Sequence, residues 1–290
     1  MDTTAARLKR LSRDRSRSRD VVGCECRGSR IPQFLQCIDK LRRRFVGSLG
    51  NRFSPNAVRH HARYRWERAI TLTTHTTRRA LVVRGGWDGH QPVAISDGFV
   101  PFLKDRGFAV ETFEDLVVYE DAERLAATDL IVQCWTSGTI THQQSVNLAA
   151  AVRAGTGLAG WHGGIVDSFL DHDYHLLTGG RFVMHPPEFL DYTVHLLPEQ
   201  AEHPVIAGLQ DFDVHTEQYW MLTDPHIEVL ATCTFPPDEQ RDRPSVMPAV
   251  WTRSWGAGRV FVSTIGHKPD DFDVPEVRTL TERGLLWASR

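Results

Sequence analysis

The sequence predicts an α/β fold in which a doubly wound, mostly parallel sheet has helices on both faces. Between residues 80 and 177, short apolar runs alternate with segments whose apolar residues recur at helical spacing, which is the pattern of strand–helix–strand units. The run GLAGW at residues 157–161 is continuous, as expected for a parallel strand buried on both faces. We find neither an internal repeat nor a linker after residue 79, so we expect one domain of this class.

The first half of this domain is predicted as alternating strands and helices. Gly107 and Gly155 are placed to end its two longer helices, and Thr141 is placed to cap the second one. In chain order we expect a strand at residues 80–83, a helix at 93–106, strands at 108–113 and 129–132, a helix at 141–154, a strand at 157–161 and a helix within 163–177.

The second half is more mixed, with strands predominating. Its last two strands are joined by the segment TRSWGAG, whose two glycines are typical of a hairpin connection. We expect strands at residues 192–197, 228–232, 249–251 and 259–263, and a final amphipathic helix at residues 274–288.

Charge divides the chain into two parts. Residues 1–79 contain 20 Lys and Arg against 6 Asp and Glu, a formal charge of +14, whereas residues 80–290 contain 14 against 30, a formal charge of −16. Residues 7–20 are Ser/Arg-rich and have almost nothing apolar to bury. We therefore predict a basic, disordered leader at residues 1–78 and a folded domain at residues 79–290. A nucleic-acid-binding arm and a transit peptide are the alternative interpretations of the leader.

The remaining composition indicates a cytoplasmic protein without a membrane partner. No apolar run approaches the roughly 20 residues that a membrane span needs. Cys134 and Cys233 stand alone in the acidic domain, so a disulfide framework is not expected and a reducing compartment is the default. A lone cysteine such as Cys134 is usually inert core. A homo-oligomer is left open.

Histidine and tryptophan residues follow several of the predicted strands. Open α/β sheets bind ligands outside the carboxyl ends of their strands, and the residues there include His90, Trp135, His162 and His267, with Trp161 beside them. Aromatic faces next to hydrogen-bonding groups suit a sugar, whose C–H face stacks while its hydroxyls hydrogen-bond. The alternative is that some of the 14 histidines fall at strand ends by chance. The glycine-rich turn RGGWDGH lacks the spacing and the lysine of a nucleotide-binding loop.

The segment GLAGWHGG places His162 between a buried strand and a pair of glycines, where other α/β enzymes carry a nucleophilic Ser or Cys. An imidazole there can act as a general base, an oxyanion donor or a metal ligand. No acyl-transfer triad can be assembled around it, and a buried structural histidine is the alternative. His185 precedes two prolines, and Glu217 and Tyr219 share one side of the segment HTEQYW if it is extended. No helical zinc-binding spacing is present, but a metal site assembled from separate loops stays open.

Five segments together resemble the ThuA-like (trehalose utilisation) family. They are GTGLAGWHGG, LLTGGRFVMHP, HPVIAGLQDFDVHTEQYW, PAVWTRSWGAGRVFVSTIGH and RGLLWA, in family order over residues 80–288. The resemblance implies a class I glutamine amidotransferase-like fold, with a flavodoxin-like sheet and an elbow after a central strand. Amidotransferases carry a Cys where this chain has His162, so glutaminase activity is not expected. Thr216 stands where many members have an acidic residue, whereas Glu217 and Tyr219 match.

The resemblance also implies a role in the catabolism of trehalose and related disaccharides, including 3-keto-sugars. We expect an isomerase, lyase or hydrolase acting on a small-molecule sugar, with His162 and Glu217 as its acid–base pair and His267 as a further catalytic group. A non-catalytic sugar-binding or regulatory module on the same fold is the alternative. We identify no organic cofactor, and nucleic acid is expected only through the leader. The expected substrate-binding residues are His90, Trp135, Trp161, His185 and Tyr219.

Overall fold

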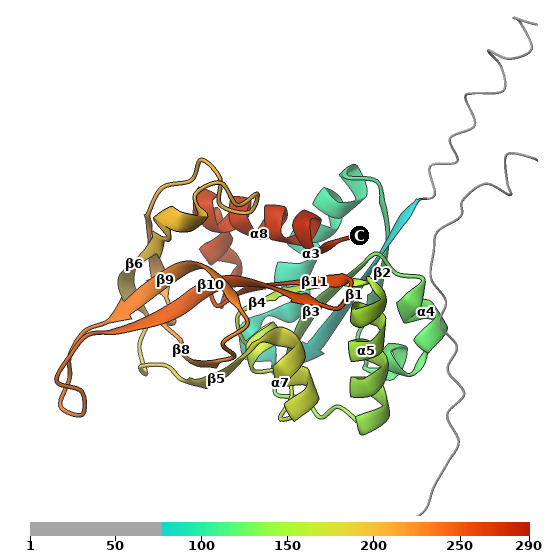
Figure 1. Ribbon diagram of the computed structural model, residues 1–290, viewed down its shortest axis with the longest axis horizontal. Coiled ribbons are helices and arrows are strands. Elements are labelled where there is room, and N and C mark those ends of the chain that lie inside the picture. Colours follow the sequence, from blue (N-terminus) through green and yellow to red (C-terminus); the bar gives the residue numbers. More distant parts are fainter. Residues whose placement is uncertain (1–76) are drawn as a thin grey trace, which may run out of the picture. The chain divides into compact units, whose positions relative to one another are not determined.

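A nine-stranded sheet runs through the part of the chain that the structure, a computed structural model, describes: residues 77–290 (Figure 1). The strand order is β2-β1-β3-β4-β11-β10-β9-β6-β7, and β5 and β8 form a separate two-stranded sheet. The predicted leader lies outside the described residues except for its last two positions. The strands are β1 (Arg78–Gly86), β2 (Phe108–Phe113), β3 (Leu130–Thr136), β4 (Gly157–Trp161), β5 (Gly180–Met184), β6 (Leu190–Leu196), β7 (Phe212–Thr216), β8 (Trp220–Thr223), β9 (Glu228–Phe235), β10 (Ser245–Trp255) and β11 (Gly258–Ser263).

The large sheet has two parts with different strand directions. Strands β2, β1, β3, β4 and β11 pair in parallel, in the flavodoxin-like order that the fold prediction requires. Beyond β11, strands β10, β9, β6 and β7 pair antiparallel. We call the first five strands the parallel half, and we call these last four strands together with β5 and β8 the antiparallel extension. The predicted α/β class with a mainly parallel sheet is confirmed.

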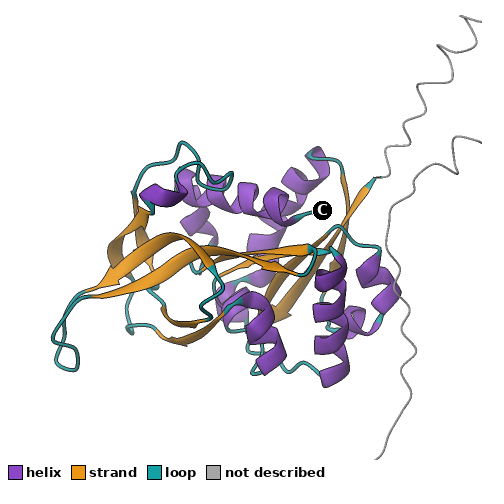
Figure 2. Cartoon of the chain, viewed as in Figure 1, coloured by secondary structure: helices purple, strands orange, loops and turns teal. Residues whose placement is uncertain are grey.

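Helices cover both faces of the sheet, as Figures 1 and 2 show. The burial of alternate strand residues explains this, because successive side chains of a strand point to opposite faces. In β1, Ala80 and Val82 join the core under α3 and α8, whereas Leu81 and Val83 join the core under α4, α5 and α7. The helices are α3 (Pro92–Asp105), α4 (Ala122–Ala126), α5 (His142–Ala154), α6 (Gly163–Val166), α7 (His172–Thr178) and α8 (Pro275–Ala288), with 3₁₀ turns η1 (Asp88–His90), η2 (Val117–Glu120), η3 (Pro198–Gln200) and η4 (Pro269–Asp273).

Several local predictions are confirmed at the level of single residues. The predicted strands at 108–113 and 157–161 coincide with β2 and β4. Thr141 caps α5 through a capping box, in which its side chain accepts from the Gln144 amide and the Gln144 side chain accepts from the Thr141 amide. Gly155 ends that helix at a φ of 125°, a conformation that favours glycine.

The predicted helix within residues 163–177 is wrong as a single element. It divides into α6 and α7, because the backbone between them pairs with the loop after β3. The Ser137 amide donates to the Asp167 carbonyl and the Gly138 amide to the Ser168 carbonyl. Strands β5, β7 and β8 and helix α4 have no counterpart among the predicted elements.

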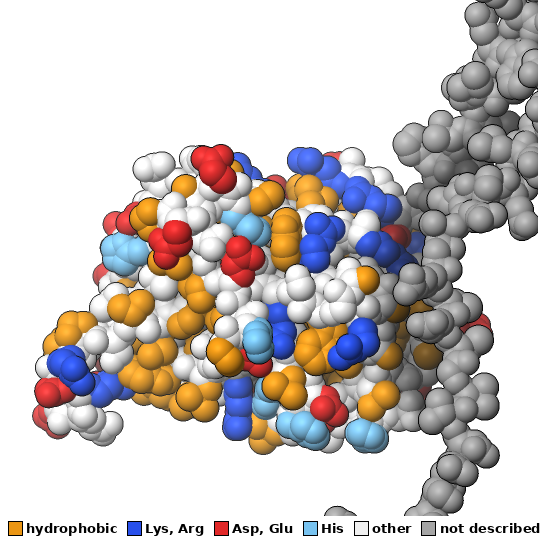
Figure 3. All heavy atoms as spheres, in the orientation of Figure 1, with side chains coloured by type: hydrophobic (Ala, Val, Ile, Leu, Met, Phe, Trp, Pro, Cys, Tyr) orange, Lys and Arg blue, Asp and Glu red, His pale blue; other side chains and the backbone are white. Residues whose placement is uncertain are grey.

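Exposed hydrophobic side chains occur in both parts of the described chain, and Figure 3 shows several on the antiparallel extension, at the end drawn to the left. They include Val183, Met184, Phe189, Leu222 and Val246. Among the described residues, no helix is long and apolar enough to cross a membrane.

Candidate active site

The chain turns sharply at His162, directly after β4. This residue has φ 51° and ψ −149°, a strained combination for a residue with a side chain. Its amide donates to the Ser263 carbonyl, and its own carbonyl accepts the first amides of α6. A Cβ on Gly163 would lie 2.4 Å from the His90 ring, and one on Gly164 would lie 3.0 Å from the Cys134 Cα. The glycines therefore permit close packing, while the positive φ falls on the histidine itself.

Backbone strain is concentrated at this edge of the sheet. Among the described residues, the non-glycine positions with positive φ are Gln91 (46°), Ser137 (55°) and His162. They follow β1, β3 and β4 respectively, beside the point between β1 and β3 where the strand order reverses. Ligands of open α/β sheets bind at such switch points, and strain of this kind clusters at functional sites.

Three imidazoles and one carboxylate converge at the elbow. His90, His162, Glu217 and His267 are all buried, and one ligand atom of each lies within 4.8 Å of the others. Glu217 Oε2 is 3.0 Å from His162 Nε2, 3.1 Å from His267 Nδ1 and 4.0 Å from His90 Nε2. His267 Nδ1 and His162 Nε2 are 3.3 Å apart. We call these four residues the His/Glu cluster.

Hydrogen bonds outside the cluster fix the orientation of its rings. His162 Nδ1 donates to the Thr264 carbonyl at 2.8 Å, so a neutral His162 presents a lone pair at Nε2. His90 Nδ1 lies 2.9 Å from Thr136 Oγ1, which leaves its Nε2 facing the cluster. The Tyr219 hydroxyl lies 2.7 Å from His162 Nε2, and the two rings stack with centroids 4.1 Å apart.

Asp271 ties the cluster to the loop after β11. Its Oδ2 accepts from the His267 amide at 2.8 Å and from the Thr216 hydroxyl at 2.7 Å. The hydroxyl of Thr216 therefore anchors the position next to Glu217. Asp271 therefore holds the cluster member His267 directly and holds Glu217 through its neighbour Thr216.

Burial and charge determine the protonation of the cluster. Burial, reinforced by repulsion from His162 and His267, lowers the pKa of His90 to about 3. Burial also lowers the pKa of His162. Burial opposes ionisation of Glu217, but its close contacts with His162 and His267 outweigh burial and hold the pKa of this carboxyl below its ordinary value. At neutral pH an anionic carboxylate therefore faces neutral imidazoles at His90 and His162.

A pocket of about 340 Å³ opens over the cluster, at the small end of ligand-binding pockets. His90 is a member of the cluster that also lines the pocket. Tyr219 lines the pocket and contacts His162 of the cluster. Burial raises the pKa of the Asp167 carboxyl, and His185 Nε2 lies 3.5 Å from Glu217 Oε1. The pocket is lined by Trp87, His90, Ser137, Asp167, Phe182, His185 and Tyr219.

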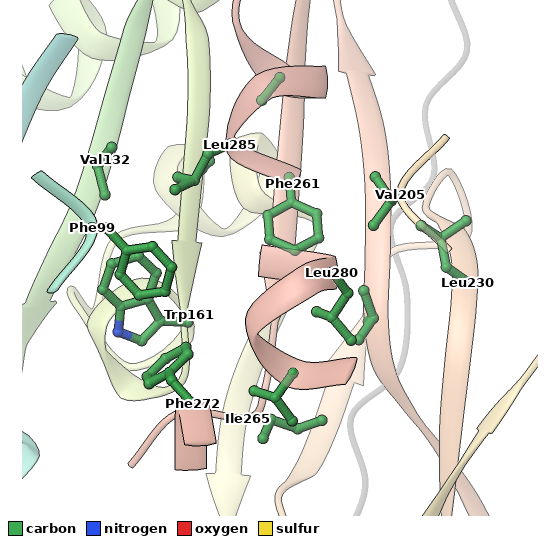
Figure 4. Packing of buried hydrophobic residues seen from close by; sticks show 14 of the residues in the cluster. Phe99, Val132, Trp161, Val205, Leu230, Phe261, Ile265, Phe272, Leu280 and Leu285 are labelled. Carbon is green, nitrogen blue, oxygen red and sulfur yellow. The ribbon is translucent and has the colours of Figure 1, made fainter. Parts of the chain in front are cut away.

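The structure brings most of the predicted site residues together, with two exceptions. Trp161 is 1% exposed and packs against Phe99 and Phe272 in the core (Figure 4), so it cannot bind a substrate in this pocket. Trp135 packs over Gly85 and is not part of the pocket wall. The aromatic faces in the wall come from Trp87 and Phe182. The prediction that Cys134 is inert agrees with its burial, which raises the pKa of its thiol to about 12.

Four pocket residues are not among the predicted site residues: Trp87, Ser137, Asp167 and Phe182. Ser137 directly follows β3, so a strand predicted to its full length would have placed it among the strand-end candidates. Asp167 is brought to the pocket by the pairing of the two loops that interrupts the predicted helix, and no local pattern signals this.

The fold and the site define a flavodoxin-like α/β protein with a histidine-rich centre at the carboxyl ends of its parallel strands. The chain belongs to the ThuA family, described as trehalose utilisation, whose family model matches residues 79–288. A comparison with curated protein sequences gives no significant match.

Solved structures share the fold. A protein from Bacteroides uniformis described as ThuA-like has a TM-score of 0.59 and 20% identity, covering 73% of this chain and 91% of its own. A second, from Parabacteroides merdae, has a TM-score of 0.57 and 16% identity, covering 73% and 89%. A cytoplasmic protein from Salmonella typhimurium has a TM-score of 0.52 and 13% identity, covering 73% and 100%. At these identities the likeness concerns the fold alone.

Proposed function

We propose that this chain is a cytoplasmic enzyme of carbohydrate catabolism that acts on a disaccharide or its 3-keto derivative in the pocket over the His/Glu cluster. The observation that carries the proposal is the composition of the pocket wall. The aromatic rings of Trp87 and Phe182 offer faces for a sugar, and Asp167, His185 and Tyr219 offer groups that donate or accept protons. The description of the family, trehalose utilisation, agrees with this substrate class.

The roles of the residues follow from their exposure to the pocket. A keto group acidifies the neighbouring C–H bond, so a base can remove that proton while donors stabilise the developing oxyanion. Asp167 and His185 lie in the wall and are the proposed proton-transfer groups. Burial raises the pKa of Tyr219 well above its ordinary value, so its phenol stays protonated and can donate to the oxyanion. His162, Glu217 and His267 form the buried centre beneath.

The proposal is tested by incubating the full chain with trehalose, sucrose, maltose and their 3-keto forms and following each sugar by NMR. We expect at least one sugar to be consumed. Asp167→Asn should reduce turnover by roughly 100-fold or more. His195→Gln serves as a control, because His195 is exposed and pairs with Asp211 away from the pocket. A sugar that raises the melting temperature without being consumed would instead identify the domain as a binding module.

A further inference from the structure

The His/Glu cluster has the form of a metal site. We infer that His90, His162, Glu217 and His267 hold one divalent transition-metal ion of the Zn²⁺ class. The inference rests on the proposed function only in treating this pocket as the working site. The ligand atoms are His90 Nε2, His162 Nε2, Glu217 Oε2 and His267 Nδ1.

The contact between His162 and Glu217 fits a cation held between the two side chains. The proton of His162 Nδ1 is already donated to the Thr264 carbonyl, so Nε2 of the neutral ring has only a lone pair. A carboxylate also has only lone pairs, yet Oε2 lies 3.0 Å away. A metal ion relieves this contact without charging the ring.

The spacing of the ligand atoms fits such an ion. Metal–ligand bonds of about 2.0–2.2 Å in tetrahedral geometry place neighbouring ligand atoms roughly 3.3–3.6 Å apart. The observed separations among His162, Glu217 and His267 are 3.0, 3.1 and 3.3 Å, so a small outward movement admits the ion. His90 Nε2, at 4.0 Å from Glu217 Oε2, is the most distant ligand and the one that also reaches the pocket wall.

The surroundings of the cluster are those of a metal centre. Metal-bound imidazoles usually donate their other N–H to an oxygen that fixes the ring, as His162 does to Thr264 and as Thr136 allows for His90. Three nitrogen donors and one carboxylate suit Zn²⁺, Mn²⁺ or Fe²⁺, whereas Mg²⁺ and Ca²⁺ prefer oxygen ligands throughout. The ion must displace the Tyr219 hydroxyl from His162 Nε2, which leaves this phenol beside the ion at the pocket wall.

The test measures metal binding directly, without a substrate. The full chain is stripped with EDTA, dialysed and titrated with ZnCl₂, MnCl₂ or MgCl₂, while bound metal is counted by mass spectrometry and melting is recorded. We expect one more equivalent of Zn²⁺ or Mn²⁺ than in the cluster variants. At a free metal concentration 100-fold above Kd, the melting temperature should rise by roughly 5–10 °C. Titration with MgCl₂ should leave it unchanged.

Variants assign the binding to the cluster, since the leader also contains Cys and His. Glu217→Gln and His267→Gln should each lose the equivalent, and Thr136→Val should weaken binding by about 10–100-fold. The exposed control His195→Gln should bind like the parent. Bound Co²⁺ should give visible bands in the parent that are absent from the cluster variants. Circular dichroism of the metal-free proteins establishes that each variant is folded.

Two results would overturn the inference: no binding of Zn²⁺, Mn²⁺ or Co²⁺ by the stripped parent, or equal binding by the parent and both cluster variants. The result of this metal-binding test can be distinguished from the result of the sugar-turnover test of the proposed function. Turnover of a sugar by a parent that binds none of these metals would refute the metal site and leave the enzyme. A bound metal without turnover of any sugar would refute the enzyme and leave the metal site.

Discussion

The parallel half and the antiparallel extension contribute different chemistry to one site. The parallel half supplies three imidazoles, His90, His162 and His267, from the ends of its strands. The extension supplies Glu217, the carboxylate of the cluster, together with Tyr219 and His185 from the segments around β5, β7 and β8. A flavodoxin-like sheet alone would therefore present imidazole rings without the anion. The extension therefore adds a negative charge, that of Glu217, to the carboxyl ends of the parallel strands.

The largest effect is expected when the contact between the two parts is broken. Glu217→Gln removes the anion of the extension and His162→Gln removes the ring of the parallel half. Because each change removes a ligand of the proposed metal centre, each should reduce kcat/KM for the sugar by about 100-fold or more. When two groups act as one unit, removing either one removes the effect of both. The kcat/KM of the double variant should therefore be no lower than that of the less active single variant. Losses that multiply in the double variant would show two independent sites. The assay is kcat/KM by NMR, with His195→Gln as the control.

The next effect concerns packing within the parallel half. Gly163→Val places a side chain where a Cβ alone would be 2.4 Å from the His90 ring, so either the ring or the elbow must move. We expect the free energy of unfolding, measured by urea denaturation, to fall by about 1–3 kcal/mol. Gly98→Ala in α3 is the matched control, because its Cβ would meet only a distant Arg278 atom at 3.9 Å. Equal stability of the two variants would contradict the close approach of elbow and His90.

A smaller effect is expected at the joint between the two parts. Thr216→Val keeps the shape of the side chain but removes the hydroxyl that donates to Asp271. One buried hydrogen bond is worth about 1 kcal/mol, so the urea midpoint should fall modestly while the m-value stays the same. Val146→Ala on exposed surface of α5 provides the reference for a change without a polar partner. An unchanged midpoint would mean that Asp271 holds His267 without this hydroxyl.

The smallest effect on stability is expected from Asp167, at the pocket wall. Burial raises the pKa of this carboxyl in the folded state, so its ionisation costs stability as pH rises above the ordinary Asp value of 3.8. Asp167→Asn cannot ionise, and we expect a slightly higher melting temperature than the parent at pH 7. The difference should vanish below pH 3.8, where the parent is protonated as well. A variant that melts lower than the parent at pH 7 would contradict this.

The sequence could predict the parallel half because its elements are specified locally. A continuous apolar run, a helix cap and a terminal glycine lie within a few residues of each other, and β4, Thr141 and Gly155 are found where expected. The strand-end rule then finds His90, His162 and His267 without knowledge of tertiary contacts. The same rule fails at Trp161, because this residue is still in the strand and its side chain points to the core. One residue further, the turn directs His162 to the cluster.

The extension and the pocket wall depend on contacts that no local pattern records. Strands β5 and β8 have five and four residues, too few for a periodic signal, and they carry His185 and Tyr219 at or beside their ends. Glu217 could be proposed from the family resemblance, but its distance from His162 depends on how β7 returns across the sheet. Asp167 reaches the pocket only through the pairing of two loops.

From the strained backbone at Gln91, Ser137 and His162 we also expect a particular course of heat inactivation. Residues in such conformations cost of order 1–3 kcal/mol each and persist only while their surroundings hold them. Relaxation of the loops after β1, β3 and β4 therefore releases backbone strain. The two hydrophobic cores on either side of the sheet hold no such strain to release. Inactivation by heat should begin at this rim, at temperatures where the sheet and its helices are still intact. The working temperature of the protein is then limited by three loop residues rather than by its core.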